Sequence, residues 1–206
     1  GGGADAAGGA GCGHLRGKGG IVVLLSNAPR PFPAVVPHMT SLGVDPDAYD
    51  TGVTSGDATR EMVAEWQGRP LFHIGPERDR GLFEGYDVHF ASPETAEIVI
   101  CSGLYDDSKE TPADYAALFE GLLARRVPMI CANPDIMVER GEELLYCAGA
   151  LAADYEAKGG TVTYAGKPHG PIYDRTLREI ARLKGRPVAR EKILCIGDGV
   201  ETDLKG

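Results

Sequence analysis

Two carboxylates near the end of the chain, Asp198 and Asp203, have the chemistry of a metal site. Asp198 follows the apolar run Ile193 to Ile196 after a single glycine, and Asp203 comes about one turn later. A short apolar run of this kind predicts a buried β-strand that delivers both carboxylates to the C-terminal edge of an α/β sheet. Carboxylate oxygens suit Mg²⁺, which keeps several waters and commonly bridges to a phosphate. The alternative is that Asp198 caps the next helix and Asp203 is solvated on that helix.

A serine and a lysine could hold the phosphate that such a metal would accompany. Ser26 ends the run Ile21 to Leu25, which predicts a strand covered on both faces. Its hydroxyl and the free N–H groups of the following turn can bind phosphate oxygens, and we favour this role over the alternative that Ser26 merely caps the turn. Lys167 is fixed between a glycine and a proline at a strand-to-helix junction. A positive charge there could neutralise a phosphate and a neighbouring carboxylate, whereas the alternative is an ordinary solvated lysine.

A third strand end carries an amide and a carboxylate. Asn133 and Asp135 follow the apolar run Val127 to Ala132, which predicts another strand. Asn-Pro-Asp is also a good turn sequence, so a binding role and a turn role are equally compatible with these residues.

Strand and helix patterns alternate along most of the chain, which predicts the α/β class with a parallel sheet. The first twenty residues are about half glycine and show no apolar periodicity, so they predict a linker without a regular element. The strand patterns lie at 21–25, 51–54, 96–101, 127–132, 161–164 and 193–196, and the helix patterns at 34–42, 55–66, 112–125, 149–158 and 172–183.

Composition narrows the class of protein further. The chain has 206 residues, 43% of them apolar, which is enough for a globular core. A formal net charge of −9 argues against a nucleic-acid or anionic-membrane partner and leaves small anionic substrates possible. Five scattered cysteines favour reduced thiols over disulfides or zinc. The sequence has no run of membrane-spanning length and no secretory signal pattern, so we expect a cytoplasmic protein.

Taken together, the motifs resemble those of the haloacid dehalogenase-like hydrolases, particularly subclass IIA, which includes the NagD-like phosphatases. The resemblance runs from Ile21 to the C-terminus. Residues similar to motifs II, III and IV of that family are, in order, Leu25-Ser26-Asn27, Gly166-Lys167-Pro168, and Gly197-Asp198 with Asp203, and Ser55 to Arg60 and Asn133-Pro134-Asp135 are similar to the subclass IIA branch.

This resemblance implies a fold and an activity. The fold is a Rossmann-like parallel core, residues 1–51 and 161–206, with an α/β cap domain inserted at 52–160. The activity is Mg²⁺-dependent hydrolysis of a small phosphorylated metabolite, a phosphate monoester, through an aspartyl-phosphate. The resemblance also leaves open the formation of a homo-oligomer through the cap domain. The implied roles are phosphoryl binding and catalysis for Ser26 and Lys167, further substrate binding for Asn27, Asn133 and Asp135, and metal binding for Asp198 and Asp203.

The sequence departs from the family at its first motif, a strand that ends in the nucleophilic aspartate. The only acid among residues 1–20 is Asp5, with no apolar strand before it, so the nucleophile cannot be identified. In the family this strand lies between the strands that carry Ser26 and Asp198, so we expect a gap there and expect the working protein to extend beyond both ends. The alternative function is a catalytically inactive phosphate- or metabolite-binding protein.

Overall fold

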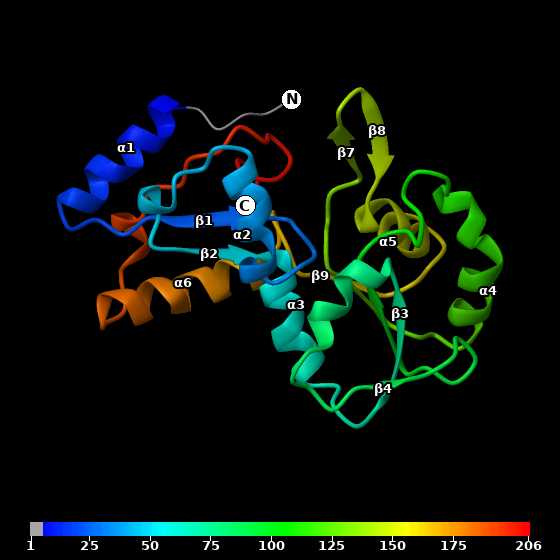
Figure 1. The fold of residues 1–206 in the computed structure, drawn as a ribbon. Coiled ribbons are helices and arrows are strands. Elements are labelled where there is room, and N and C mark those ends of the chain that lie inside the picture. The colour runs from blue at the N-terminus through cyan, green and yellow to red at the C-terminus, as the bar shows by residue number, and fades with distance from the viewer. Residues whose placement is uncertain (1–5) are drawn as a thin grey trace.

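The computed structural model describes residues 6–206, which form two lobes joined through α3 (Ser55–Ala64) (Figure 1). One lobe holds a parallel pair of strands with the helices α2 and α6 beside it, and the other holds a five-stranded parallel sheet. The elements of the first lobe are α1 (Ala6–Gly17), β1 (Val23–Ser26), α2 (Phe32–Ser41), η1 (Pro46–Ala48), β2 (Thr51–Thr54), α6 (Gly170–Lys184) and η4 (Arg190–Lys192).

The second lobe is built on a sheet of strand order β4-β3-β5-β6-β9, with every neighbouring pair parallel. An antiparallel hairpin, β7-β8, stands beside it (Figure 1). The strands of this lobe are β3 (Pro70–Ile74), β4 (His89–Phe90), β5 (Ile98–Cys101), β6 (Met129–Cys131), β7 (Met137–Arg140), β8 (Glu143–Tyr146) and β9 (Val162–Tyr164); its helices are η2 (Glu77–Phe83), η3 (Pro112–Tyr115), α4 (Ala116–Ala124) and α5 (Ala148–Ala157).

Both faces of the five-stranded sheet are covered, which explains why β5 is apolar at every position. On one face α4 and α5 supply Phe119, Leu151 and Tyr155, all fully buried. The Tyr155 hydroxyl donates to the Val127 carbonyl oxygen at 2.6 Å, so the polar end of this ring is satisfied inside the core. On the other face Val63 of α3 joins the apolar side chains of η2.

In the first lobe, β1 pairs with β2 in parallel, Ser26 opposite Thr54. Thr54 caps α3 through a reciprocal pair of hydrogen bonds with Asp57. The carboxylate of Asp57 also accepts the backbone N–H of Phe32 at 3.2 Å. The first turn of α3 therefore fixes the loop that follows β1.

The α/β class is confirmed, and most predicted elements are present. Strand β2 occupies the predicted residues, and α2, α5, β9 and α6 begin and end within two residues of the predicted bounds. The fold is a parallel α/β core with a second α/β unit.

The predicted strand at Ile193 to Ile196 is wrong. The segment has no regular structure, and Leu194 and Ile196 are 83% and 89% exposed. A strand needs a hydrogen-bonding neighbour, and within residues 6–206 no strand lies beside this segment. A cavity of about 1050 Å³ separates it from β1, which is itself only half-buried and so not covered on both faces as predicted.

The prediction of no regular element in the first twenty residues is also wrong, because α1 spans Ala6–Gly17. Gly19, at φ 78°, ends the helix while the N–H of Gly20 bonds to the Leu15 carbonyl oxygen at 3.0 Å. Arg16 makes an ion pair with Asp50 at 3.0 Å, which ties α1 to the lobe. Asp5 lies outside the described residues.

The predicted domain boundaries both fall inside a sheet. The boundary at 51/52 lies within β2, and the boundary at 160/161 separates β9 from β6, its partner in the five-stranded sheet. Arg175 of α6 makes an ion pair with Glu61 of α3 at 2.7 Å, so α3 is attached to the first lobe.

Every helix of residues 6–206 is too short or too polar to cross a bilayer. All five cysteines are free thiols, and Cys195 lies in the exposed segment after η4.

Candidate active site

Asn27 joins three strand ends that are far apart in the sequence. Its side-chain Nδ2 donates to Asp135 Oδ1 at 2.8 Å and to the Lys167 carbonyl oxygen at 3.1 Å. Its Oδ1 accepts the backbone N–H of Lys167 at 2.8 Å. This amide is buried, and each of its hydrogen bonds is made with the loop after β6 or the loop after β9. Asn27 therefore fixes these two loops relative to the end of β1.

The Lys167 side chain points to a carboxylate rather than to bulk solvent. Lys167 Nζ lies 2.6 Å from Asp203 Oδ1, and the two side chains are 14% and 20% exposed. Asp203 Oδ2 also accepts the backbone N–H of Gly199 at 3.1 Å. Burial acts to raise the pKa of Asp203, but the hydrogen bonds from Lys167 and Gly199 outweigh it and the pKa is lowered. The site therefore holds a lysine and an ionised carboxylate in direct contact.

Gly166 allows this close approach of segments. A Cβ at Gly166 would lie 2.5 Å from Asn27 Oδ1, 2.7 Å from Pro134 Cδ and 2.7 Å from Ser55 Oγ. The Ser55 hydroxyl is fully buried and has no hydrogen-bond partner among the described residues. The first turn of α3 thus belongs to the same junction.

The structure brings Asn27, Asp135, Lys167 and Asp203 into one bonded network. Ser26 lies at its edge, where the Ser26 hydroxyl oxygen accepts the N–H of Ala28 at 3.2 Å in the capping role that the sequence left open.

Asn133 likewise shows its turn role. Its Oδ1 accepts the backbone N–H of Asp135 at 3.0 Å. Through Asp135, which bonds to Asn27, Asn133 is nonetheless linked to the network.

Asp198 is separate from the network but shares its cavity. Its side chain is exposed and makes no hydrogen bond within residues 6–206. Asp198, Lys167 and Asp203 all line the cavity between β1 and the exposed segment.

The donor set at this cavity fits Mg²⁺. The described residues contain no group of three His, Cys, Asp or Glu side chains that could enclose a metal. Mg²⁺ needs no such cage, because it is usually held by one or two carboxylates together with waters and substrate phosphates. Asp198 and Asp203 supply two hard oxygen donors to one cavity, which is the set that this ion prefers.

The sequence analysis missed Thr54, and it did not predict the contact of Arg60, which belongs to the stretch similar to subclass IIA. Thr54, rather than Ser55, caps α3, and its hydroxyl donates to the Arg30 carbonyl oxygen at 2.7 Å. The spacing Thr54-x-x-Asp57 is a capping-box pattern and could have indicated this cap. Arg60 donates to the Gly81 carbonyl oxygen at 2.7 Å, a contact between lobes for which the sequence has no local signal.

Comparison with solved structures places this junction in a known family. A hydrolase of the haloacid dehalogenase-like family from Brucella suis 1330 shares 49% identity with the chain, with a TM-score of 0.92; the match covers 98% of this chain and 77% of that one. The chain belongs to the haloacid dehalogenase-like hydrolase family. No protein-family model and no curated protein sequence matches it.

Further matches agree with the resemblance to the NagD-like, subclass IIA hydrolases. The 4-nitrophenylphosphatase from Thermotoga maritima shares 27% identity at a TM-score of 0.66, over 93% of this chain and 70% of that one. A protein provisionally assigned as NagD shares 27% identity at a TM-score of 0.68, over 93% of this chain and 72% of its own.

Proposed function

We propose that this protein is a phosphatase that hydrolyses small-molecule phosphate monoesters. The network of Asn27, Lys167 and Asp203 carries the proposal, because it fixes a cation and an anion together at the ends of β1 and β9. Such a preorganised pair can meet the charge that develops on a transferring phosphoryl group without reorganising. The phosphatase name of the Thermotoga maritima protein supports the same reaction.

Each residue has a role that its contacts support. Lys167 neutralises phosphoryl oxygens, and Ser26 donates to them through its hydroxyl and the N–H groups of the following turn. Asn27 holds the backbone of Lys167, and Asp135 orients Asn27. Asp198 and Asp203 would hold Mg²⁺, which supplies charge neutralisation when bound.

The attacking aspartate is assigned to no residue of 6–206. Within these residues β1 pairs on one edge alone, and the cavity of about 1050 Å³ lies along it, bounded by Lys167 and Asp203 at one end. We propose that an extended segment ending in an aspartate pairs with β1 and brings a carboxylate beside Lys167. The carboxylate would attack phosphorus and break the bond to the ester oxygen, so that the alcohol leaves with a proton; water would then attack the aspartyl-phosphate, releasing inorganic phosphate and regenerating the carboxylate.

The topology also supports a revised partition into domains. The core would comprise α1 to α3 and the chain from Gly166 onward, and the cap would comprise Pro70 to Tyr164, the whole five-stranded sheet with its hairpin. A cap of this kind closes over the leaving group and excludes water.

The decisive test is hydrolysis of p-nitrophenyl phosphate with Mg²⁺. We expect no turnover by these 206 residues alone and clear turnover by a form extended upstream with an aspartate-bearing strand. Turnover by the 206 residues alone would show that the segment is not needed. An extended form that binds inorganic phosphate without hydrolysing the ester would establish the binding protein instead of the enzyme.

A further inference from the structure

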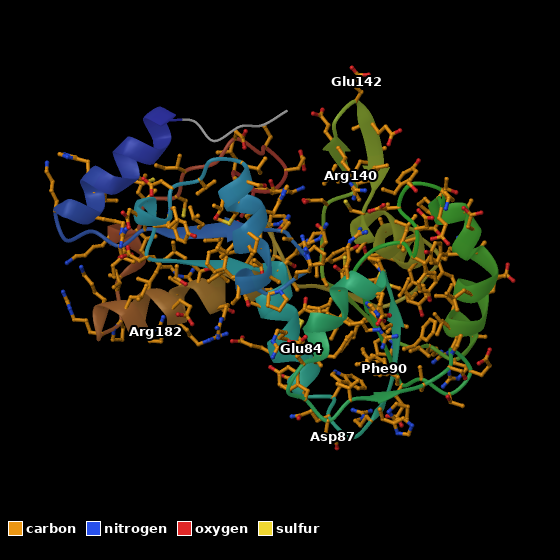
Figure 2. The ribbon with its side chains drawn as sticks, viewed as in Figure 1. Glu84, Asp87, Phe90, Arg140, Glu142 and Arg182 are labelled. Atoms are coloured by element: carbon orange, nitrogen blue, oxygen red, sulfur yellow. The ribbon has the colours of Figure 1, made fainter. Side chains whose placement is uncertain are left out.

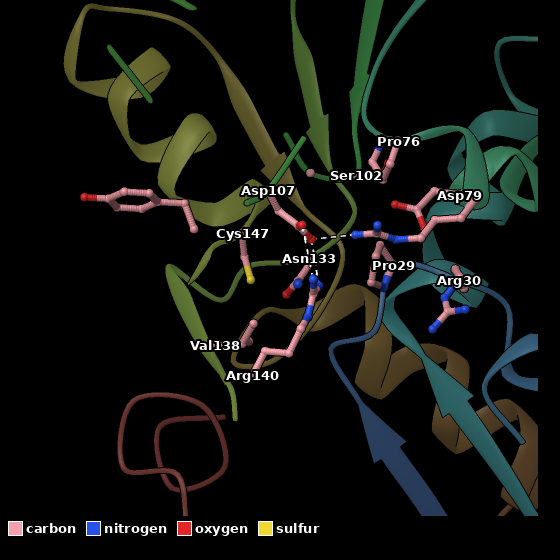
Figure 3. A pocket seen from close by; sticks show the side chains of 13 residues that line it. Pro29, Arg30, Pro76, Asp79, Ser102, Asp107, Asn133, Val138, Arg140 and Cys147 are labelled. Carbon is pink, nitrogen blue, oxygen red and sulfur yellow. Dashed lines mark hydrogen bonds and ion pairs between the residues drawn. The ribbon is translucent and has the colours of Figure 1, made fainter. Parts of the chain in front are cut away.

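A second cavity, of about 180 Å³, opens between the loop after β1 and the β7-β8 hairpin (Figure 3). Its charged and amide side chains come from both lobes: Arg30 belongs to the first lobe, and the others belong to the second lobe. Those that carry the argument are Arg30, Arg78, Asp79, Asp107, Asn133 and Arg140.

Three guanidinium groups outnumber two carboxylates in this cavity. Arg78 Nη2 and Arg140 Nη2 lie 2.6 and 2.7 Å from the same oxygen of Asp107. The hydrogen bond from Arg140 is the largest cause of the lowered pKa of Asp107, so this carboxylate is ionised and shared by two cations. The guanidinium group of Arg30 makes no hydrogen bond or ion pair within residues 6–206. Arg30 nevertheless acts on Asp79 through space, where it opposes the rise in pKa that burial causes, and the net positive charge of the cavity comes from three guanidinium groups facing two carboxylates.

Asp79 adds a second unsatisfied group. It is only 2% exposed, and its Oδ1 has no hydrogen-bond partner among the described residues. Burial raises the pKa of this carboxyl group. A buried polar atom without a partner is costly, and its position in a cavity wall makes it available to a ligand hydroxyl or amide.

The cavity is connected to the candidate phosphoryl site through the loop after β1 and through hydrogen bonds. Arg30 follows Ser26 and Asn27 by a short turn, and Thr54 fixes its backbone. Asn133 lines the cavity and also holds the N–H of Asp135, which bonds to Asn27. A small molecule whose phosphate lies at Lys167 would therefore extend its leaving group toward Arg30.

We infer that this cavity binds an anionic group on the leaving alcohol of the substrate. The inference rests on the proposed phosphatase function and names its substrate class: phosphate monoesters that carry a second anion, a carboxylate or another phosphate. Guanidinium groups bind both anions through paired N–H donors, and Arg30 is the donor left free for this purpose. The small volume limits the group to a few atoms beyond the reacting phosphate.

The test compares substrates that differ in charge but hardly in shape. The compounds are 3-phosphonooxypropanoate, its neutral amide 3-phosphonooxypropanamide, and propane-1,3-diol bisphosphate, each assayed with Mg²⁺ and the form extended upstream with the aspartate-bearing strand. We expect kcat/KM for one of the two anionic esters to exceed that for the amide by about tenfold or more, and the better one identifies the anion.

Variants assign the preference to the cavity. Arg30→Gln, and separately Arg140→Gln, should reduce the ratio of anionic ester to amide about tenfold, with thermal unfolding to show that each variant folds. Arg182→Gln is the matched control, because Arg182 lies on α6 away from the hairpin that carries Arg140 (Figure 2). The ratio of the control should equal that of the wild type.

Binding of non-hydrolysable analogues separates this inference from the proposed function. Calorimetry with 4-phosphonobutanoate and 4-phosphonobutanamide should show the acid bound about tenfold more tightly, and Arg30→Gln should remove the difference. Equal binding and equal hydrolysis of acid and amide would overturn the subsite while leaving the phosphatase intact. Tighter binding of the acid by a protein that hydrolyses none of the esters would uphold the subsite and overturn the phosphatase.

Discussion

Replacing Gly166 with alanine tests whether the three loops meet as closely as the structure shows. The new Cβ would lie within 3.0 Å of atoms from Asn27, Pro134 and Ser55, which belong to three different segments. Real Cβ atoms essentially never approach other heavy atoms this closely, so at least one segment must move. Asn27 cannot rotate freely, because both ends of its amide are hydrogen-bonded.

The expected cost follows from the geometry. Adding a methyl group to a packed junction typically destabilises by about 1–3 kcal/mol, and three simultaneous contacts favour the upper part of that range. For a chain of this size, each kcal/mol lowers Tm by about 2–4 °C, so the upper part of the range corresponds to a decrease of about 4–12 °C in calorimetry. A displaced Asn27 should also release the N–H of Lys167. Turnover by the active form, which is the protein extended upstream with the aspartate-bearing strand, should therefore fall together with Tm.

Gly121→Ala is the matched control. Gly121 lies in the exposed part of α4, and a Cβ there would meet nothing within 4 Å. Alanine in a helix interior is favoured over glycine by about 0.5–1 kcal/mol, so this variant should be slightly more stable than the wild type. A Gly166→Ala protein as stable as the Gly121→Ala protein would refute the tight junction and, with it, the positioning of Lys167 by Asn27.

Three other changes have defined outcomes. In the active form, Lys167→Ala should lower kcat for p-nitrophenyl phosphate by about 10²-fold, as expected for a transition-state charge stabiliser, while Lys158→Ala should not. Asp198→Asn should weaken Mg²⁺ binding in calorimetry with an unchanged Tm, because its exposed side chain contributes no contact to the fold. Burial, with a smaller effect from Arg80, lowers the pKa of His73 to about 4, so the folded state binds fewer protons than the unfolded state. The contribution of His73 to the free energy of unfolding should therefore be fully present above about pH 6.5 and should fall by about 3 kcal/mol as the pH approaches 4. In denaturant titrations the His73→Gln protein should lack this loss, whereas the His38→Gln protein should retain it.

Local patterns predicted the elements whose partners lie nearby in the sequence. The apolar run that ends at Cys101 predicted β5, and the helix pattern around Phe119 predicted α4. These predictions succeeded because β5 and α4 both bury apolar side chains in the same lobe. The resemblance to a family assigns Asn27 and Lys167 to substrate binding, but the hydrogen bond between them was not predicted, since no local pattern connects these residues. The cavity around Arg30 could not be predicted at all, because its charges come from separate loops of both lobes.

The wrong strand at Ile193 to Ile196 shows which part of strand formation the sequence does not encode locally. Apolar β-branched residues favour an extended conformation, but the backbone N–H and C=O groups are satisfied only when a neighbouring strand pairs with them. In residues 6–206 that neighbour is not present, and the segment lies exposed across a cavity from the free edge of β1. A strand that enters the cavity would pair with β1 on one side and with the segment from Ile193 to Ile196 on the other. The same pairing would bury Leu194 and Ile196. The position of Asp198 would then be fixed by the pairing rather than by its own sequence, so binding of Mg²⁺ at Asp198 and formation of the sheet should be coupled.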